Sequence, residues 1–372
     1  MTSIAVLDHH VIYDNPIPEL RARHGYFPGL VRLPSGDLLA LFCIAEALDA
    51  ANSVTVVSRS KDSGNTWSLE GPLYEKAPDR QFDSFYMKPL VLDDGGLIAT
   101  GYRFHRTDPD QTLANAETDG MRDGDNIISF SADEGHTWST PEVISRRRPE
   151  LVEASGPAIQ LRSGALLFGG SLFPMWDGSH PSGFVGVLLR SEDQGKTWDD
   201  QTHFFEDPQQ RFMPSEPRFC EMQDNRVVSL VWTTDHAAAI NLSNHMTVSE
   251  DGGKTWTAPI DTDIQAQASN LLYLGNDLLL TIHSHREGNP EDIGLTVRIA
   301  DISGNSWATI SERTIWQGAP PSRVGNYSGM AMSLKFGQPS LLRLDDGEIL
   351  ATHWAVQNGQ GRILTHRLRV EP

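Results

Sequence analysis

Cysteine and cationic side chains are both scarce in this chain of 372 residues. Its two cysteines, Cys43 and Cys220, lie far apart within apolar runs. We therefore expect buried free thiols rather than a disulfide. Lys and Arg number 30 against 49 Asp and Glu, which gives a formal net charge of -19 at pH 7. Because phosphate backbones are bound by clustered Lys and Arg, this balance argues against a nucleic-acid partner.

Long apolar segments are absent as well. No window approaches the roughly 18 apolar residues of a membrane-spanning helix, so we expect no membrane partner. The first residues also lack a basic segment followed by a long apolar one, the pattern of a signal peptide. These absences predict a cytoplasmic protein, or a secreted one if a leader has been removed. The 32 Gly and 22 Pro indicate many turns instead of long helices.

The chain does contain a repeated octet of the form Ser-x-Asp-x-Gly-x-Thr-Trp. Four copies read SKDSGNTW (60–67), SADEGHTW (131–138), SEDQGKTW (191–198) and SEDGGKTW (249–256), and a weaker copy, ADISGNSW, spans 300–307. In such a turn the Asp accepts hydrogen bonds from backbone N–H groups, the Gly adopts a positive φ, and the Trp packs beneath the loop. We interpret the octets as structural turns of a repeat architecture.

A second pattern recurs between the octets: two apolar runs joined by a tight polar turn, which predicts a β-hairpin. Six such hairpins lie at 30–42, 89–101, 157–169, 217–232, 270–282 and 339–354. With a third strand, an octet turn and a fourth strand after each hairpin, the sequence predicts an all-β fold. We expect a six-bladed β-propeller of four-stranded antiparallel blades, forming one domain over residues 1–372. A last strand at 362–370 is expected to pair with the N-terminal strand at 4–12 and close the ring.

The octet resembles the Asp box of the sialidase (neuraminidase) superfamily, and the order of hairpin and box is similar along nearly the whole chain. Members of that superfamily have a Ser-Glu-Pro stretch whose glutamate pairs with a nucleophilic tyrosine. Residues 215–217 match this stretch, which implies Glu216 for the glutamate, and Tyr327 resembles the tyrosine. Asp49, in the loop after the first hairpin, resembles the catalytic acid of the superfamily.

Two departures from the superfamily concern the arginines that clamp the carboxylate of sialic acid. The Arg-Ile-Pro motif of the first inner strand is replaced by Tyr26-Phe27-Pro28, and the stretch 232–236 lacks the arginine expected there. The resemblance therefore implies a relative that acts on another sugar and not a true sialidase. Asp boxes also occur in lyases and in binding proteins on related propellers.

The propeller topology by itself brings a set of side chains to one face. Loops that enter the innermost strands and loops that leave the second strands surround the axis there, while the octet turns lie on the other face. Carboxylates suited to acid, base or nucleophile chemistry are Glu216, Asp83 and Asp49, with Tyr327 added by the resemblance. The side chains that we expect to contact substrate are Tyr26, Glu46, Lys88, Arg103, His105, Glu153, Arg218, Asp235, His236, His283, His285, Arg286, Gln338, His353 and Trp354.

Several of these residues also have a purely structural interpretation. In that interpretation Glu216 serves only as a structural partner of Arg218, Asp83 caps a turn, and Trp354 packs in the core. The histidines of this face are expected to bind sugar hydroxyls in preference to a metal, although a divalent metal remains an open alternative. No other cofactor is expected.

The mixture of acids, guanidinium groups and aromatic rings is typical of a carbohydrate site. We predict an exo-acting glycoside hydrolase that removes an acidic or otherwise polar terminal sugar from a glycan. One alternative is a polysaccharide lyase that acts on uronic-acid-containing glycans through His and Tyr, with or without a metal. The other is a noncatalytic carbohydrate-binding propeller.

Overall fold

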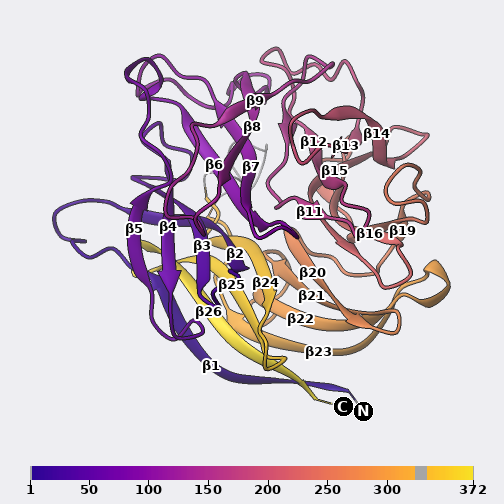
Figure 1. The fold of residues 1–372 in the computed structure, drawn as a ribbon. Helices are drawn as coiled ribbons and strands as arrows, with labels where there is room; N and C mark the ends of the chain where they lie inside the picture. Colours follow the sequence, from indigo (N-terminus) through magenta and orange to yellow (C-terminus); the bar gives the residue numbers. More distant parts are fainter. Residues whose placement is uncertain (1, 323–332, 372) are drawn as a thin grey trace.

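Six antiparallel sheets are arranged around an axis in the computed structural model, which describes residues 2–322 and 333–371 (Figure 1). The innermost strands of neighbouring sheets contact one another around this axis. The predicted all-β, six-bladed propeller is thereby confirmed. The only helices among the described residues are two 3-10 turns, Pro78–Arg80 and Ser303–Asn305, so this part of the chain has no helix long and apolar enough to cross a membrane.

Each blade is built from strands that follow one another in the chain, from the axis outward. Blade 1 contains β2 (His24–Arg32), β3 (Leu38–Ala45), β4 (Val54–Ser60) and β5 (Ser68–Pro72). Blade 2 contains β6 (Ser84–Val91), β7 (Leu97–Phe104), β8 (Gly124–Ser131) and β9 (Glu142–Ile144). In blade 3 the innermost strand is split into β10 (Val152–Glu153) and β11 (Ile159–Gln160), followed by β12 (Leu166–Leu172), β13 (Val185–Ser191) and β14 (Asp199–Glu206).

The second half of the ring follows the same order. Blade 4 contains β15 (Phe212–Glu221), β16 (Val227–Asp235), the short β17 (Ile240–Asn241), β18 (His245–Ser249) and β19 (Ile260–Asp261). Blade 5 contains β20 (Ser269–Gly275), β21 (Leu278–His285), β22 (Gly294–Asp301) and β23 (Ala308–Gln317). Blade 6 contains β24 (Phe336–Arg343), β25 (Ile349–Gln357), β26 (Gln360–Glu371) and, as its outermost strand, β1 (Ser3–Tyr13).

Strand β1 closes the ring, as the sequence predicts. It pairs antiparallel with β26 from Ser3 opposite Glu371 to Tyr13 opposite Ile363. The two ends of the chain therefore lie side by side at the lower edge of Figure 1. Blade 6 is thus composed of both ends of the sequence, so neither end leaves an unpaired inner edge.

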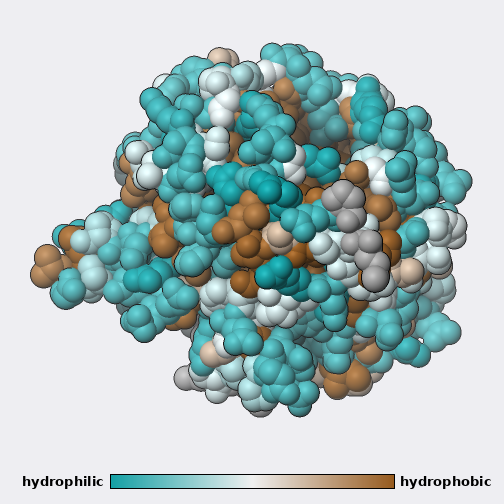
Figure 2. Space-filling view, turned by 90° about the horizontal axis from the view of Figure 1, so that it is seen from below, coloured by the Kyte–Doolittle hydropathy of each residue, from teal (hydrophilic) through white to brown (hydrophobic). Residues whose placement is uncertain are grey.

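The core consists of apolar layers between neighbouring blades. Between blades 1 and 2, for example, Leu39 and Leu41 pack with Phe85 and Ile127, all of them buried. Cys43 and Cys220 are both free thiols, the first buried and the second half-buried. On the side that faces downward in Figure 1, the surface is mostly hydrophilic with scattered hydrophobic areas (Figure 2). Because apolar layers lie between neighbouring blades, each sheet is covered on both faces. This explains why its strands read as continuous apolar runs.

The four good octets fold as near-identical box turns between the third and fourth strands. In the copy at 131–138, Oδ1 of Asp133 accepts hydrogen bonds from the Thr137 N–H at 2.8 Å and the Ser131 hydroxyl at 2.9 Å. The indole of Trp138 donates to the carbonyl oxygen of Gly135 at 3.0 Å. Gly135 has a φ of +81°. The interpretation of the octets as structural turns is confirmed by these contacts.

The glycine of each box turn also packs against the preceding blade. An added Cβ would lie 3.0 Å from Leu350 at Gly64, 2.4 Å from Leu39 at Gly135, 2.8 Å from Ile128 at Gly195 and 2.9 Å from Leu167 at Gly253. At Gly304, in the weaker copy, such a Cβ would meet nothing within 4 Å. The glycines of the strong copies therefore pack tightly against the preceding blade, and Gly304 of the weak copy lacks this contact.

The box aspartates make the stability of the fold sensitive to acid. Hydrogen bonds from the side chain and backbone of Thr137 lower the pKa of Asp133 to about 2, and Asp193 and Asp251 behave alike. A carboxyl whose pKa is lower in the folded state stabilises that state above its unfolded pKa of about 3.9, and the contribution is lost as pH falls toward the folded value. We expect the free energy of unfolding to fall between about pH 4 and pH 2.

Asp133→Asn tests this expectation by urea denaturation at pH 7 and at pH 3. The variant should be less stable than the parent at pH 7, and the difference should shrink at pH 3, where the parent carboxyl begins to take up a proton. Asp79→Asn, at an exposed position of the first 3-10 turn, is the matched control and should change stability at neither pH. A destabilisation by Asp133→Asn that is equal at both pH values would contradict the assignment.

Candidate functional site

Three innermost strands leave their regular pairing at a residue that precedes proline. Phe27 in β2, Glu216 in β15 and Gln338 in β24 have φ values of +56°, +46° and +42°. At each position the residue and its proline lie opposite a single residue of the next strand, which is a β-bulge. A positive φ at a non-glycine residue costs about 1–3 kcal/mol, and such strain clusters at functional sites. The bulges therefore point to the axis as the candidate site.

Glu216 is the centre of a group of polar side chains near the axis. Its backbone N–H donates to Oε2 of Glu153 at 3.1 Å, and its own Oε1 accepts a hydrogen bond from Nε2 of Gln338. The other carboxylate oxygen of Glu216 is buried and has no hydrogen-bond partner among the described residues. An unsatisfied buried carboxylate oxygen is costly. This unsatisfied oxygen marks Glu216 as a candidate for a functional role.

Glu153 supplies a second carboxyl group to this cluster. It is 7% exposed. Burial raises its pKa, and the negative charge of Glu216 raises it further. Glu153 is therefore a buried carboxyl group that holds the backbone N–H of Glu216, in surroundings that favour its protonated form.

Two buried cations complete what we call the central group: Lys88, Glu153, Glu216, Arg218 and Gln338. Lys88 Nζ donates to the carbonyl oxygens of Phe27 and Pro28, the latter at 3.0 Å. Arg218 Nη1 donates to the carbonyl oxygens of Pro217 at 2.9 Å and Glu216 at 3.2 Å, so it holds the bulge and not the carboxylate. Burial, followed by the charge of Arg218, lowers the pKa of Lys88 to about 7. The central group therefore holds both acidic and basic side chains in one buried place.

Asp49 reaches the same region from the loop after β3. Its Oδ1 accepts a hydrogen bond from the hydroxyl of Tyr86 at 2.6 Å. Burial raises the pKa of Asp49, and the bond from Tyr86 and the charge of Arg106 oppose that rise. Tyr86 lines a cavity of about 10 Å³ together with Phe27, Lys88, Tyr102, Ser155 and Gln338, which is room for about one water molecule. One hydrogen bond thus connects Asp49 to the central cavity.

Tyr26 and Trp354 lie behind this cavity, with their rings in a T-shaped contact at 5.2 Å. Trp354 has no exposed surface and belongs to the core cluster shared by blades 1 and 6. Core packing, the alternative interpretation, describes Trp354 in this structure, and its contact with substrate stays a prediction. Tyr26 is also buried, and its part in binding stays a prediction.

Two of the histidines are likewise enclosed within their blades. His283 has no exposed surface, and its ring nitrogens contact the hydroxyls of Ser269 at 3.0 Å and Thr281 at 2.8 Å. His353 has none either, and its Nε2 contacts the ring of His366 at 3.1 Å. These contacts lie within the blade of each histidine, and contact of His283 and His353 with substrate stays a prediction.

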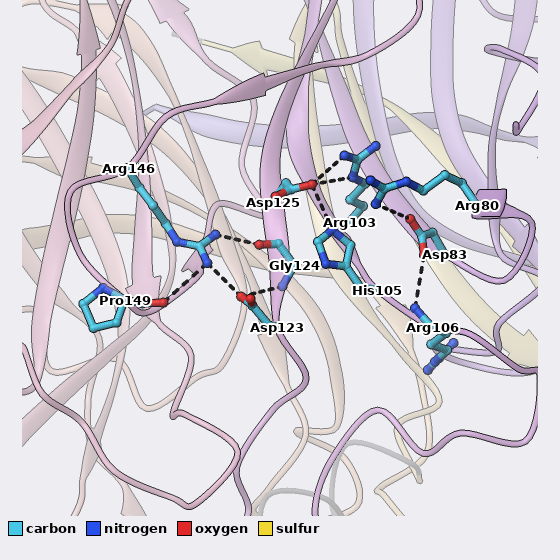
Figure 3. A network of polar contacts seen from close by, with 10 residues as sticks. All are labelled: Arg80, Asp83, Arg103, His105, Arg106, Asp123, Gly124, Asp125, Arg146 and Pro149. Carbon is cyan, nitrogen blue, oxygen red and sulfur yellow. Dashed lines mark hydrogen bonds and ion pairs between the residues drawn. The ribbon is translucent and has the colours of Figure 1, made fainter.

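The candidates from blade 2 form a network of their own, which Figure 3 shows. Asp83 accepts a hydrogen bond from the backbone N–H of Arg106 at 3.1 Å, in keeping with its alternative interpretation as a loop cap. Arg103 and His105 both contact Oδ2 of Asp125, at 2.8 and 2.9 Å. Burial alone would raise the pKa of Asp125, but these hydrogen bonds lower it to about 2. The structure therefore pairs Arg103 and His105 with a carboxylate outside the central group.

The remaining candidates lie around the rim. Glu46 is exposed, and Asp235 pairs with Arg211 at 3.7 Å. His236 stacks on Phe184 with ring centroids 4.0 Å apart. His285 contacts Arg298 and the carbonyl oxygen of Gln265, and Arg286 donates to the carbonyl oxygen of Phe336. None of these contacts joins the central group, and their roles stay predictions.

Tyr327 lies outside the described residues. The central cavity is also lined by four residues that the sequence does not predict as site residues: Phe27, Tyr86, Tyr102 and Ser155. For the first inner strand the sequence predicts Tyr26 instead of Phe27. One signal could have found part of the group: Phe27, Lys88, Glu216 and Gln338 each directly precede a proline near the start of an inner strand. Within residues 2–322 and 333–371, no three His, Cys, Asp or Glu side chains are grouped so that they could hold a metal ion.

Comparisons with solved structures agree with this architecture. The chain is similar to a protein of unknown function from Dyadobacter fermentans, with 21% identity, a TM-score of 0.78, and coverage of 99% of this chain and 100% of that one. It is similar to a mutant of the NanB sialidase from Streptococcus pneumoniae, with 12% identity, a TM-score of 0.67, and coverage of 97% and 71%. An α-L-arabinanase from Penicillium chrysogenum in complex with arabinobiose gives 15% identity, a TM-score of 0.64, and coverage of 98% of both chains.

At these identities the likeness shows the fold, and it confirms the resemblance to the sialidase superfamily at that level. Curated protein sequences give no significant match. A family model described as a BNR repeat-like domain matches residues 114–350, which is more than half of the chain. The protein belongs to the BNR repeat-like domain family.

Proposed function

We propose that this protein is an exo-acting glycoside hydrolase that removes an acidic or otherwise polar terminal sugar from a glycan at the mouth of its axis. The observation that carries the proposal is Glu216. A strained bulge holds it beside the second carboxyl group of Glu153, and one of its carboxylate oxygens has no partner among the described residues. Strain and an unsatisfied charge persist where binding or catalysis uses them.

The chemistry follows from two acidic groups in different environments. Asp49, whose pKa is raised by burial, donates its proton to the oxygen of the departing group as the glycosidic bond breaks. Glu216 takes a proton from the water molecule that attacks the anomeric carbon, and proton exchange with solvent then returns both carboxyl groups to their starting states. The net reaction consumes one water molecule, which supplies hydrogen to the leaving group and a hydroxyl to the sugar. Glu153 acts as a positioning residue, since it holds the backbone N–H of Glu216.

The preference for an acidic or polar sugar is supported by the two cations of the central group. Neither Lys88 nor Arg218 has a carboxylate within 4.0 Å among the described residues. Buried cations that lack an ion-pair partner favour ligands with a carboxylate or several hydroxyls. The similar structures include sialidases and an arabinanase bound to arabinobiose, which supports a carbohydrate ligand for this propeller as well.

Incubation with a panel of 4-nitrophenyl glycosides and uronic-acid oligosaccharides, analysed by NMR, tests the proposal. We expect release of a free reducing monosaccharide from the non-reducing end. Products that absorb ultraviolet light as unsaturated uronates would indicate a lyase, and binding without any product would indicate a noncatalytic module. Either of these two results would overturn the hydrolase proposal.

A further inference from the structure

A second cavity opens on the axis face outside the central group. Its volume is 310 Å³, within the size range of small-molecule sites, which begins at about 300 Å³. It lies between the loop that follows β3 and the long loop that follows β7. Asp49 and Arg106 contribute its charged groups, and Leu113, Ala114 and Ala116 are among its apolar walls. We call it the Arg106 pocket.

Arg106 is buried in this pocket without an ion-pair partner. It is 5% exposed, and the described residues offer its guanidinium no carboxylate within 4.0 Å. Nη1 donates to the Ser84 hydroxyl and Nη2 to the carbonyl oxygen of Asp49, both at 2.7 Å, while Nε has no partner. Arginine keeps its charge even when buried. A guanidinium that neutral acceptors hold in the wall of a pocket, with no carboxylate beside it, is suited to bind an anion from outside.

Asp49 connects the pocket to the central cavity without lining that cavity itself. It lines the pocket, and its carboxyl is bonded to Tyr86, which lines the central cavity. Because the central cavity has room for about one water molecule, a glycan unit whose glycosidic oxygen lies at Asp49 fits on the side of the Arg106 pocket. The alanines of its walls leave room that larger side chains would fill.

We propose that the Arg106 pocket binds the leaving-group side of the glycan and recognises a carboxylate on that unit through Arg106. This inference rests on the proposed hydrolase function, because it takes Asp49 as the group that protonates the departing oxygen. Apolar walls would contact the C–H faces of the ring, and the guanidinium would supply the charged anchor. The natural substrate would then carry a uronic acid next to the sugar that is removed.

Binding of sodium glucuronate to the intact protein tests the proposal, with uncharged glucuronamide as the neutral probe of the same shape. We expect glucuronate to bind more tightly than glucuronamide in an NMR titration. Arg106→Gln should weaken glucuronate binding by about tenfold or more, the cost of one charged hydrogen-bonded contact. Ala116→Trp, at an exposed wall position, should abolish binding of both probes by filling the pocket.

Ala132→Trp is the matched control, because Ala132 is exposed in a box turn on the opposite face. Other box turns have Lys61, Glu192 and Glu250 at the same place, so the larger side chain should fold normally and leave binding unchanged. Equal binding of the two probes, no binding of either, or binding that survives Ala116→Trp would each overturn the proposal. Failure of the hydrolase function is separate: it would appear as absent turnover while glucuronate binding still depended on Arg106 and Ala116.

Discussion

Glu216→Gln is expected to lower kcat/KM by about three orders of magnitude on any glycoside that the protein cleaves, the size typical for loss of a positioned acid–base group. The amide keeps the shape of the side chain and can still contact Gln338, but it cannot accept a proton from the attacking water molecule. The limb of the pH–rate profile that reports this base should also disappear. The fold should persist, because Arg218 holds the carbonyl oxygen of residue 216 and not its side chain.

The matched control for this variant is Glu221→Gln. Glu221 lies in the same strand and accepts a hydrogen bond from the backbone N–H of Arg162 at 2.9 Å, away from the central group. Its kcat/KM should stay within about twofold of the parent, because the contacts that this half-buried carboxylate makes among the described residues run to Arg162 and not to the central group. Thermal denaturation of both variants separates lost chemistry from lost structure. Full activity in a folded Glu216→Gln protein would remove Glu216 from the mechanism.

Removal of strand β1 should have the largest effect on stability. Ile4, Ile12 and Tyr13 are buried, and burial of such side chains contributes about 1.5–3 kcal/mol each. Their combined loss is comparable with the whole stability of an ordinary domain, about 5–15 kcal/mol. The deletion would also uncover the edge of β26, which invites aggregation. We expect the chain without residues 2–13 to be insoluble or to lack a cooperative unfolding transition.

A rearranged chain provides the control for this deletion. Because Ser3 lies opposite Glu371, residues 3–13 can be attached after Glu371 through a short turn in a chain that starts at residue 14. This protein should regain solubility and a cooperative transition near that of the parent, measured by circular dichroism. A stable, monomeric deletion variant, or a rearranged chain as unstable as the deletion, would show that β1 does not close the ring.

The architecture could be predicted from the sequence because its signals are local. The box turn at 131–138 needs only residues within eight positions of one another, and each hairpin needs only its own two runs and turn. The same logic predicts ring closure by β1, since the six hairpins leave one strand unpaired near the start of the sequence and one extra strand near its end. Their repetition made each assignment support the others.

The candidate site could be predicted only in part, because it depends on contacts between blades. Alternation along a strand places His283 on one face of its sheet. It does not reveal that the neighbouring blade covers this face completely. The bond between Asp49 and Tyr86 joins residues 37 positions apart in different blades, and no local pattern encodes it. The Ser-Glu-Pro match identifies Glu216 in the sequence. No local sequence pattern distinguishes Tyr86 from the other tyrosines in strands.

The pre-proline bulges at Phe27, Glu216 and Gln338 have a consequence for the effect of substitutions there. At each bulge one residue and its proline leave the regular strand pairing, and the pairing resumes at the residue after the proline. A substitution at the bulge residue therefore changes a side chain near the axis without repacking the sheets around it. The hydrogen-bonding register of each of these blades is therefore independent of which side chain stands at its bulge.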